Sequence, residues 1–155
     1  MTQMTKNFSL AELTKSETAL RLGIENQPDD DQLNNLLLLC ANVLQPIRDH
    51  YGKGVKVNSA LRTIPVNRAV GSSDSSHHVK GQAADIEIPG VPNAELAEYI
   101  RDNLPFTQVI LEFYTRGIPD SGWVHVSYDP QNLKKQALTA VKENGKTVYL
   151  QGIQA

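Results

Sequence analysis

The most constraining feature of the sequence is a long stretch, Asp31 to Tyr51, whose apolar side chains recur every three or four positions. This spacing gathers the apolar side chains on one side of a helix, so the stretch predicts a long core helix. Gly52 and Gly54 follow it and are expected to end it. The apolar positions are Leu33, Leu36, Leu37, Cys40, Val43, Leu44 and Ile47.

Shorter helices and several strands are predicted around this core helix. Ser9, with Glu12 three positions later, forms a helix-capping signature, and Ser16 offers a second cap. A Pro-started helix is expected over 65–70, and an amphipathic helix over 93–104 with Asn93 as its cap. Alternating or β-rich runs predict strands at 55–60, 82–88, 107–113 and 123–128, and an edge strand at 146–150. Because the helices come first and the strands gather later, the fold class is α+β, with N-terminal helices packed on one face of a mainly antiparallel sheet.

Length and composition narrow the possible functions. A chain of 155 residues with 40% hydrophobic residues is expected to form one globular domain over 1–155. The formal charge of −2 argues against nucleic-acid binding, and no run approaches the length of a membrane span. The single Cys40 excludes an internal disulfide and Cys-based zinc motifs, and its place in the core helix predicts a buried, inert thiol.

Two strands and one loop hold the residues that carry chemistry. In the strand at 82–88, Asp85 lies on the face opposite Ala84 and Ile86, and in the strand at 123–128, His125 lies opposite the core row. If the two strands are neighbours, Asp85 and His125 converge on one point. His78 stands seven residues before Asp85, with Gly81 allowing the loop to double back.

Two imidazoles and one carboxylate leave a fourth position open, as in catalytic zinc sites. There a bound water has its pKa lowered towards ~7 and becomes a nucleophile at neutral pH. Ser76 and the loop backbone could fix the imidazole tautomer. Taken singly, the histidines are more often ordinary side chains than ligands: His77 and His78 fit a solvated loop pair, and His125 fits a packed strand residue.

The motif SxHxxGxAxD beginning at Ser76, followed by WxH beginning at Trp123, resembles the zinc D-alanyl-D-alanine peptidases. That family contains carboxypeptidases, dipeptidases and phage-type peptidoglycan endopeptidases, and shares its fold with the hedgehog signalling domain. The resemblance spans about residues 8–128 and is strongest to short cell-wall peptidase domains that are common in phage genomes. It implies a hedgehog/DD-peptidase-like fold with Zn²⁺ bound by His78, Asp85 and His125.

The resemblance also suggests substrate contacts. Arg62 falls where the family keeps an arginine that grips a substrate carboxylate or carbonyl, a task that suits the guanidinium fork. Ser76 joins Arg62 as a candidate for substrate binding, and Trp123 is expected to wall the pocket, with plain core packing as the alternative. Family members usually have Gly-Tyr directly before the arginine, whereas this chain has Ala60-Leu61. An aromatic side chain that could line the pocket is therefore missing.

A second departure concerns the general base. Many family members place a Glu or His three residues before the last ligand, and that position here is Gly122. Two other carboxylates could take the proton of the attacking water. Glu112 lies opposite the expected core row Val109, Leu111 and Phe113, and Asp120 lies on a loop. We favour Glu112, because a strand holds a side chain in place better than a loop does.

The resemblance thus implies a zinc-dependent D,D-carboxypeptidase or peptidoglycan endopeptidase that acts on stem peptides. We expect the chain to be a monomer without a nucleic-acid partner. The opening residues lack the apolar core of a secretory signal, so the chain is expected to be made in the cytoplasm and to reach the wall through a releasing partner. A phage lysin or a host enzyme trimmed of its leader fits equally. Gly122 keeps an alternative open, a catalytically inactive, zinc-stabilised wall-binding or structural domain.

Overall fold

The computed structural model describes residues 2–155 and is built around a six-stranded sheet. Neighbouring strands are antiparallel except β5 and β7, which are parallel. The fold therefore confirms the predicted α+β class with a mainly antiparallel sheet. In spatial order the strands are β3 (Lys56–Ser59), β4 (Ala83–Glu87), β6 (Trp123–Ser127), β5 (Gln108–Glu112), β7 (Gln136–Glu143) and β8 (Lys146–Gln151).

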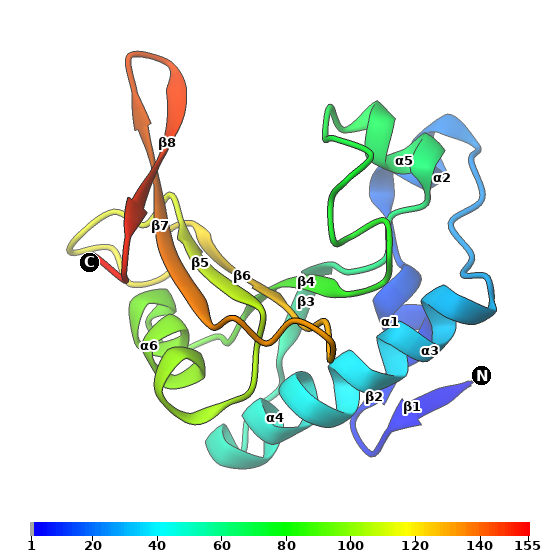
Figure 1. The fold of residues 1–155 in the computed structure, drawn as a ribbon, viewed down its shortest axis with the longest axis horizontal. Coiled ribbons are helices and arrows are strands. Elements are labelled where there is room, and N and C mark those ends of the chain that lie inside the picture. The colour runs from blue at the N-terminus through cyan, green and yellow to red at the C-terminus, as the bar shows by residue number, and fades with distance from the viewer. Residues whose placement is uncertain (1) are drawn as a thin grey trace.

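Helices cover one face of this sheet (Figure 1). The remaining elements are a small ribbon of β1 (Gln3–Thr5) and β2 (Phe8–Ser9), and the helices α1 (Leu10–Thr14), α2 (Glu17–Leu22), α3 (Asp30–Leu39), α4 (Gln45–Tyr51), α5 (Ile64–Ala69) and α6 (Asn93–Asn103). The core joins α3, α4 and α6 to the sheet through fully buried side chains such as Leu36, Ile47 and Ile100. Each such side chain contributes about 1.5–3 kcal/mol by its removal from water.

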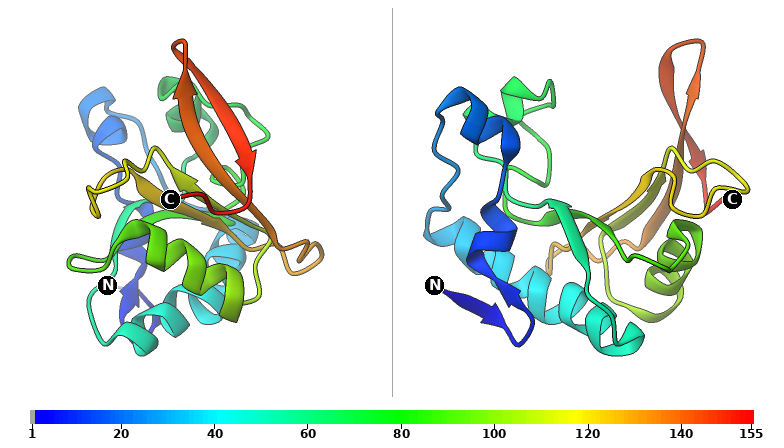
Figure 2. Two further views of the ribbon diagram at one scale, coloured as in Figure 1. Left: turned by 90° about the vertical axis from the view of Figure 1, so that its left-hand side faces the viewer. Right: turned by 180° about the vertical axis from the view of Figure 1, so that it is seen from behind.

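The other face of the sheet is flanked by two projecting segments. Figures 1 and 2 show the β7–β8 hairpin rising on one flank and the α2 and α5 segments rising on the other. The sheet face between them carries Asp85 and His125. No helix in the described part of the chain is long and apolar enough to cross a membrane.

The predicted core helix exists but is not uniform. It runs from Asp30 to Tyr51 and contains a π-helical turn, η1 (Cys40–Leu44), in which the N–H of Gln45 donates to the Cys40 carbonyl. Pro46 follows directly. It has no N–H to donate and its ring crowds the preceding turn, so a wider turn relieves the clash. Gly52 ends the helix as predicted, at a φ of 64°.

Other predictions about local structure are confirmed. Ser9 and Glu12 form the capping box of α1, and the Ser16 hydroxyl accepts the N–H of Ala19 at the start of α2. Cys40 is fully buried, and burial, with the nearby charge of Glu12, raises the pKa of its thiol to about 12, so it stays protonated and unreactive.

The cap predicted for α6 is wrong. Pro92 precedes the helix, and Asn93 is its first residue and has no capping hydrogen bond. The buried side-chain amide of Asn93 instead donates to the carbonyl oxygens of Ser121 at 3.0 Å and Gly122 at 3.3 Å. Asn93 therefore ties the loop before β6 to the start of α6.

Strand β7 was not predicted, whereas the edge strand at 146–150 is confirmed as β8. The β7 sequence, QALTAVKE, is rich in alanine and charged residues, which have low β propensity. Its strand conformation comes from its neighbours: β7 pairs parallel to β5 and antiparallel to β8. Tertiary pairing thus overrides a weak local preference.

Candidate metal and substrate site

His78, Asp85 and His125 meet on the open face of the sheet. Asp85 in β4 and His125 in β6 are directly opposite each other in the antiparallel register, so their side chains share one face. Asp85 Oδ1 lies 3.0 Å from His125 Nδ1 and 3.3 Å from His78 Nε2. One ligand atom from each of the three residues lies within 4.8 Å of the others. The convergence predicted from strand alternation is therefore present.

The orientation of the His78 ring is set by a backbone carbonyl. His78 Nδ1 lies 2.7 Å from the carbonyl oxygen of Ala60, which can only accept, so Nδ1 carries the proton. In the neutral ring this leaves the lone pair on Nε2, the nitrogen that faces Asp85. The Ser76 hydroxyl accepts the backbone N–H of His78 at 3.2 Å, so Ser76 holds the loop while Ala60 holds the ring.

The loop that delivers His78 doubles back at Gly81, as predicted. Gly81 has a φ of +73°, and a Cβ there would come within 2.7 Å of the Gln32 carbonyl oxygen of α3. The Gln32 side chain in turn donates to the Val79 carbonyl at 2.8 Å. The loop is thus held against the first turn of α3, which fixes where His78 stands.

The three side chains are largely removed from water. The exposed fraction of the side chain is 3% for His78, 12% for His125 and 16% for Asp85. Burial opposes ionisation of Asp85, but when both imidazoles carry a proton on the nitrogen that faces Asp85, their hydrogen bonds and charge outweigh it and hold the pKa of this carboxyl well below its ordinary value. Asp85 is therefore an anion that, with two imidazole nitrogens, offers the donor set typical of catalytic zinc.

A pocket of about 340 Å³ opens over this group. Arg62, Glu112 and Trp123, all candidates from the sequence, line it together with Ser76 and His77. His77 stands beside His78 but is not one of the three converging residues. The metal candidates thus face a space large enough for part of a peptide.

Glu112 is the carboxylate that the structure brings to this pocket. It ends β5 opposite Trp123 and is half-buried. Burial raises the pKa of Glu112; His125 and Arg62 oppose the rise, and Asp85 adds to it. The Trp123 indole also lowers this pKa, but its Nε1 does not reach hydrogen-bond geometry with any described residue.

The core row predicted for β5 is correct at Val109 and Leu111 and wrong at Phe113. The strand ends at Glu112, and Phe113 takes a left-handed conformation with a φ of 55°. Its ring turns away from the main core and packs edge-on against Trp123, with ring centres 5.5 Å apart. Strict alternation fails here because the backbone leaves the sheet.

Gly122 explains the missing base of the family pattern. It has a φ of +64°, and a Cβ at this position would overlap the Glu112 carbonyl oxygen and lie 2.8 Å from the carbonyl carbon of Phe113. No side chain fits at this position with the present backbone. A carboxylate or imidazole at 122 is therefore excluded by space, whereas the neighbouring Glu112 lines the pocket.

Asp120 lies outside the pocket. Its side chain is exposed, on a loop that is tied to α6 by the Asn93 N–H, which donates to the Pro119 carbonyl at 2.9 Å. Of the two carboxylates favoured by the sequence, only Glu112 lines the pocket with the metal candidates.

Arg62 lines the pocket through a half-buried side chain. Its backbone N–H donates to the His78 carbonyl at 3.0 Å, which couples the arginine to the ligand loop. Its buried Nε has no hydrogen-bond partner among residues 2–155. Burial lowers the pKa of the guanidinium, and Asp85 and Glu112 oppose this effect. A desolvated, unpaired guanidinium is suited to a bidentate carboxylate ligand.

Tyr149 is a pocket residue that the sequence did not indicate. It comes from β8, outside the stretch of resemblance, and is 55% exposed although it lines the pocket. Ala60 and Leu61, which replace the expected Gly-Tyr, are buried in the core. The hairpin therefore brings an aromatic ring to the site from a different part of the chain.

Comparison with known proteins places the chain in a family. The family model described as Peptidase M15 matches residues 6–127, which include His78, Asp85, His125, Arg62 and Glu112. No individually curated protein matches the chain significantly. The match covers well over half of the chain and ends before β7 and β8. With this match and the His–Asp–His geometry, the chain belongs to the peptidase M15 family, the zinc-dependent D-Ala-D-Ala carboxypeptidase type.

Proposed function

We propose that this chain is a zinc metallopeptidase that hydrolyses peptidoglycan stem-peptide bonds involving D-amino acids. The observation that carries the proposal is the group of His78, Asp85 and His125 at the floor of a pocket that also holds Glu112 and Arg62. A metal site of purely structural type has four protein ligands, whereas this group provides three, and all three line a pocket from which water or substrate could supply a fourth.

The donor set fits zinc. His78 presents Nε2 because its Nδ1 is engaged by the Ala60 carbonyl, and an imidazole held through its other nitrogen is the usual arrangement in zinc sites. Asp85 supplies an anionic oxygen between the two rings. A zinc ion held there supplies Lewis acidity, which polarises the scissile carbonyl and acidifies the attacking water.

The protein's own residues supply the remaining steps. Glu112, whose pKa is raised by burial, takes the proton from the attacking water and returns it to the leaving amine. Arg62 holds a carboxylate or carbonyl of the substrate. Trp123 and Tyr149 wall the pocket and restrict the path of the peptide.

The direct test uses zinc-loaded protein on purified peptidoglycan and on a synthetic stem pentapeptide. Mass spectrometry is expected to detect stem-peptide fragments, and a chelator is expected to stop their release. Stoichiometric zinc with no turnover on any wall chemistry would overturn the peptidase and leave the inactive, zinc-stabilised binding domain. The fragments also separate carboxypeptidase from endopeptidase action, because the former releases only the terminal residue.

We propose the bacterial cell wall as the place of action, since the proposed substrate occurs there. The test is addition of purified protein to intact and to outer-membrane-permeabilised cells. Lysis or release of wall peptides only after the permeability barrier is removed supports a dependence on a releasing partner.

Replacing His78 by alanine is expected to abolish stoichiometric zinc binding, because the site offers only three protein ligands and the variant keeps two of them. Loss of a ligand should weaken zinc affinity by at least the ~10–100-fold seen when only the partners of a ligand are removed. Elemental analysis after dialysis measures the effect. His77→Ala is the matched control, one position away, and should keep its zinc; equal loss in both variants would contradict the assignment.

Replacing Tyr149 by alanine is expected to raise KM for the stem peptide about three- to tenfold with little change in kcat, because an aromatic contact contributes ~0.5–1.5 kcal/mol. Tyr149→Phe should keep most of the affinity. Thr147→Ala, on the same face of β8 but outside the pocket, is the control. Steady-state kinetics measure KM and kcat for the three variants. An unchanged KM in Tyr149→Ala would contradict a contact between the β7–β8 hairpin and the substrate.

A further inference from the structure

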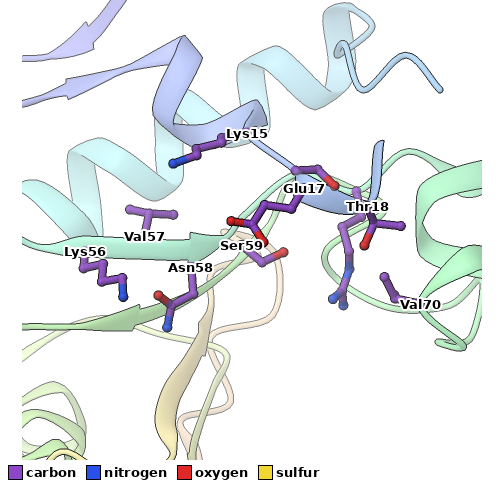
Figure 3. Close-up of a pocket in the computed structure, with 10 residues that line it drawn as sticks. Lys15, Glu17, Thr18, Lys56, Val57, Asn58, Ser59 and Val70 are labelled. Atoms are coloured by element: carbon purple, nitrogen blue, oxygen red, sulfur yellow. The ribbon is translucent and has the colours of Figure 1, made fainter. Parts of the chain in front are cut away.

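A second pocket lies next to the metal pocket, and Arg62 lines both. Its volume is about 410 Å³, and its polar lining includes Lys15, Glu17, Lys56 and Ser59. Figure 3 shows Lys15 and Lys56 at one end of this pocket, Thr18 and Val70 at the other, and Glu17 and Ser59 between them. This lysine pocket could not be predicted from sequence, because its residues come from several separate segments, chiefly the start of α2 with the residues before it and β3.

The lysine pocket lies along β3, the strand next to β4, which carries Asp85. Lys56 is opposite Glu87 in the β3–β4 register, so its side chain shares the face of Asp85, whereas Val57 is opposite the core residue Ile86. The register shifts after Val57 and brings Ser59 opposite Asp85. β3 is the last strand on this side of the sheet. The two pockets therefore share Arg62, and the lysine pocket lies towards the edge of the sheet.

The charge of the lysine pocket is positive. Lys15, Lys56 and Arg62 face one acid, Glu17, among its lining residues. Both lysines are exposed, and neither forms an ion pair with any residue that the structure describes. Unpaired cations around a polar hollow favour an anion, and a peptide substrate provides one as a free carboxylate.

We propose that the lysine pocket binds a free carboxylate of the peptide substrate, on a residue outside the bond held at the metal site. The substrate then passes over Arg62 and reaches the edge of β3. This inference rests on the proposed peptidase function and deepens it: the preferred substrate is an acidic peptide that extends beyond the scissile pair on the β3 side.

The test compares two synthetic pentapeptides that differ by one charge. The first is L-alanyl-γ-D-glutamyl-L-lysyl-D-alanyl-D-alanine with a free glutamyl α-carboxylate, and the second is the same peptide with that carboxylate amidated. Calorimetry with the zinc-loaded Glu112→Gln protein gives Kd without turnover. The acidic peptide is expected to bind about three- to tenfold tighter at low salt, as for two exposed ion pairs, and the preference should shrink as salt is added.

The variant Lys15→Gln/Lys56→Gln should lose this preference while its Kd for the amidated peptide and its zinc content stay unchanged. Lys6→Gln/Lys53→Gln changes the net charge equally at exposed lysines outside both pockets, and it should keep the preference. Equal Kd values for the two peptides, no binding of either, or a preference that survives in the Lys15/Lys56 variant would overturn the inference.

Turnover by the wild-type protein separates this inference from the proposed function. Tighter binding of the acidic peptide without hydrolysis of either peptide would support the lysine pocket as a carboxylate site and contradict the proposed peptidase activity. Hydrolysis of both peptides at equal kcat/KM, with equal Kd values, would support the proposed peptidase activity and contradict carboxylate binding by Lys15 and Lys56.

Discussion

Glu112→Gln is expected to lower kcat about 10²–10⁴-fold while the zinc content stays at the wild-type level. The glutamine side chain has nearly the same shape but cannot accept the proton of the attacking water. Glu112 is half-buried, lines the metal pocket and is not one of the three metal candidates, so its loss should leave the metal site intact. Single-turnover kinetics on a stem peptide, with zinc measured in the same sample, test both parts.

The pH dependence of kcat/KM should carry the signature of Glu112. A general base acts as the anion, so activity is present above its pKa and is lost as pH falls through it. Burial raises the pKa of Glu112, which moves this loss to a higher pH than for an ordinary glutamate. The residual activity of Glu112→Gln should lack this acidic limb.

Asp120→Asn is the matched control, because Asp120 is exposed and lies outside the pocket. It should change kcat by less than about twofold, as expected for a surface substitution away from the site. The reverse pattern, with a large loss in Asp120→Asn and wild-type activity in Glu112→Gln, would assign the base to the loop.

The convergence of the metal candidates could be predicted because it follows from local rules. Alternation in β4 and β6 puts Asp85 and His125 on the face opposite the core row, and neighbouring strands then bring them together. His78 follows from the motif and from the sharp reversal at Gly81. These relations depend on side-chain period and backbone sterics, which a sequence displays directly.

The parts that could not be predicted depend on contacts between distant segments. β7 has low β propensity and becomes a strand through pairing with β5 and β8, so Tyr149 could not be assigned to the pocket. Phe113 leaves the alternation because the chain turns after Glu112. The lysine pocket combines residues about forty positions apart, Lys15 and Lys56, whose proximity no local pattern encodes.

Gly122 could be recognised in the sequence only as the absence of a base, whereas the structure gives it a steric role. Its left-handed backbone lets the chain enter β6 directly beneath the carbonyl of Glu112. Asn93 holds the same turn by donating to the carbonyls of Ser121 and Gly122. Gly122, which has no side chain that could act as a base, is thus the residue whose close approach allows Glu112 to occupy its position.

Gly122→Ala is expected to lower the free energy of unfolding by about 2–5 kcal/mol, the sum of ~1–2 kcal/mol for a left-handed non-glycine residue and ~1–3 kcal/mol for overpacking. The Cβ would overlap the Glu112 carbonyl oxygen, so β5 and β6 must shift apart where Glu112 pairs with Trp123. Activity should therefore fall together with stability. Urea unfolding followed by tryptophan fluorescence measures the change, since Trp123 is the only tryptophan.

Gly117→Ala separates the two contributions to this loss. Gly117 lies in the same loop with a φ of +89°, but a Cβ there would meet no atom within 4 Å. This variant should lose only the ~1–2 kcal/mol of backbone strain and keep its activity. Because both alanines are held at a positive φ, the difference between them mainly reflects the clash with Glu112. Equal destabilisation would mean that the β5–β6 junction relaxes freely, and position 122 could then accept the side chain that the family pattern places there.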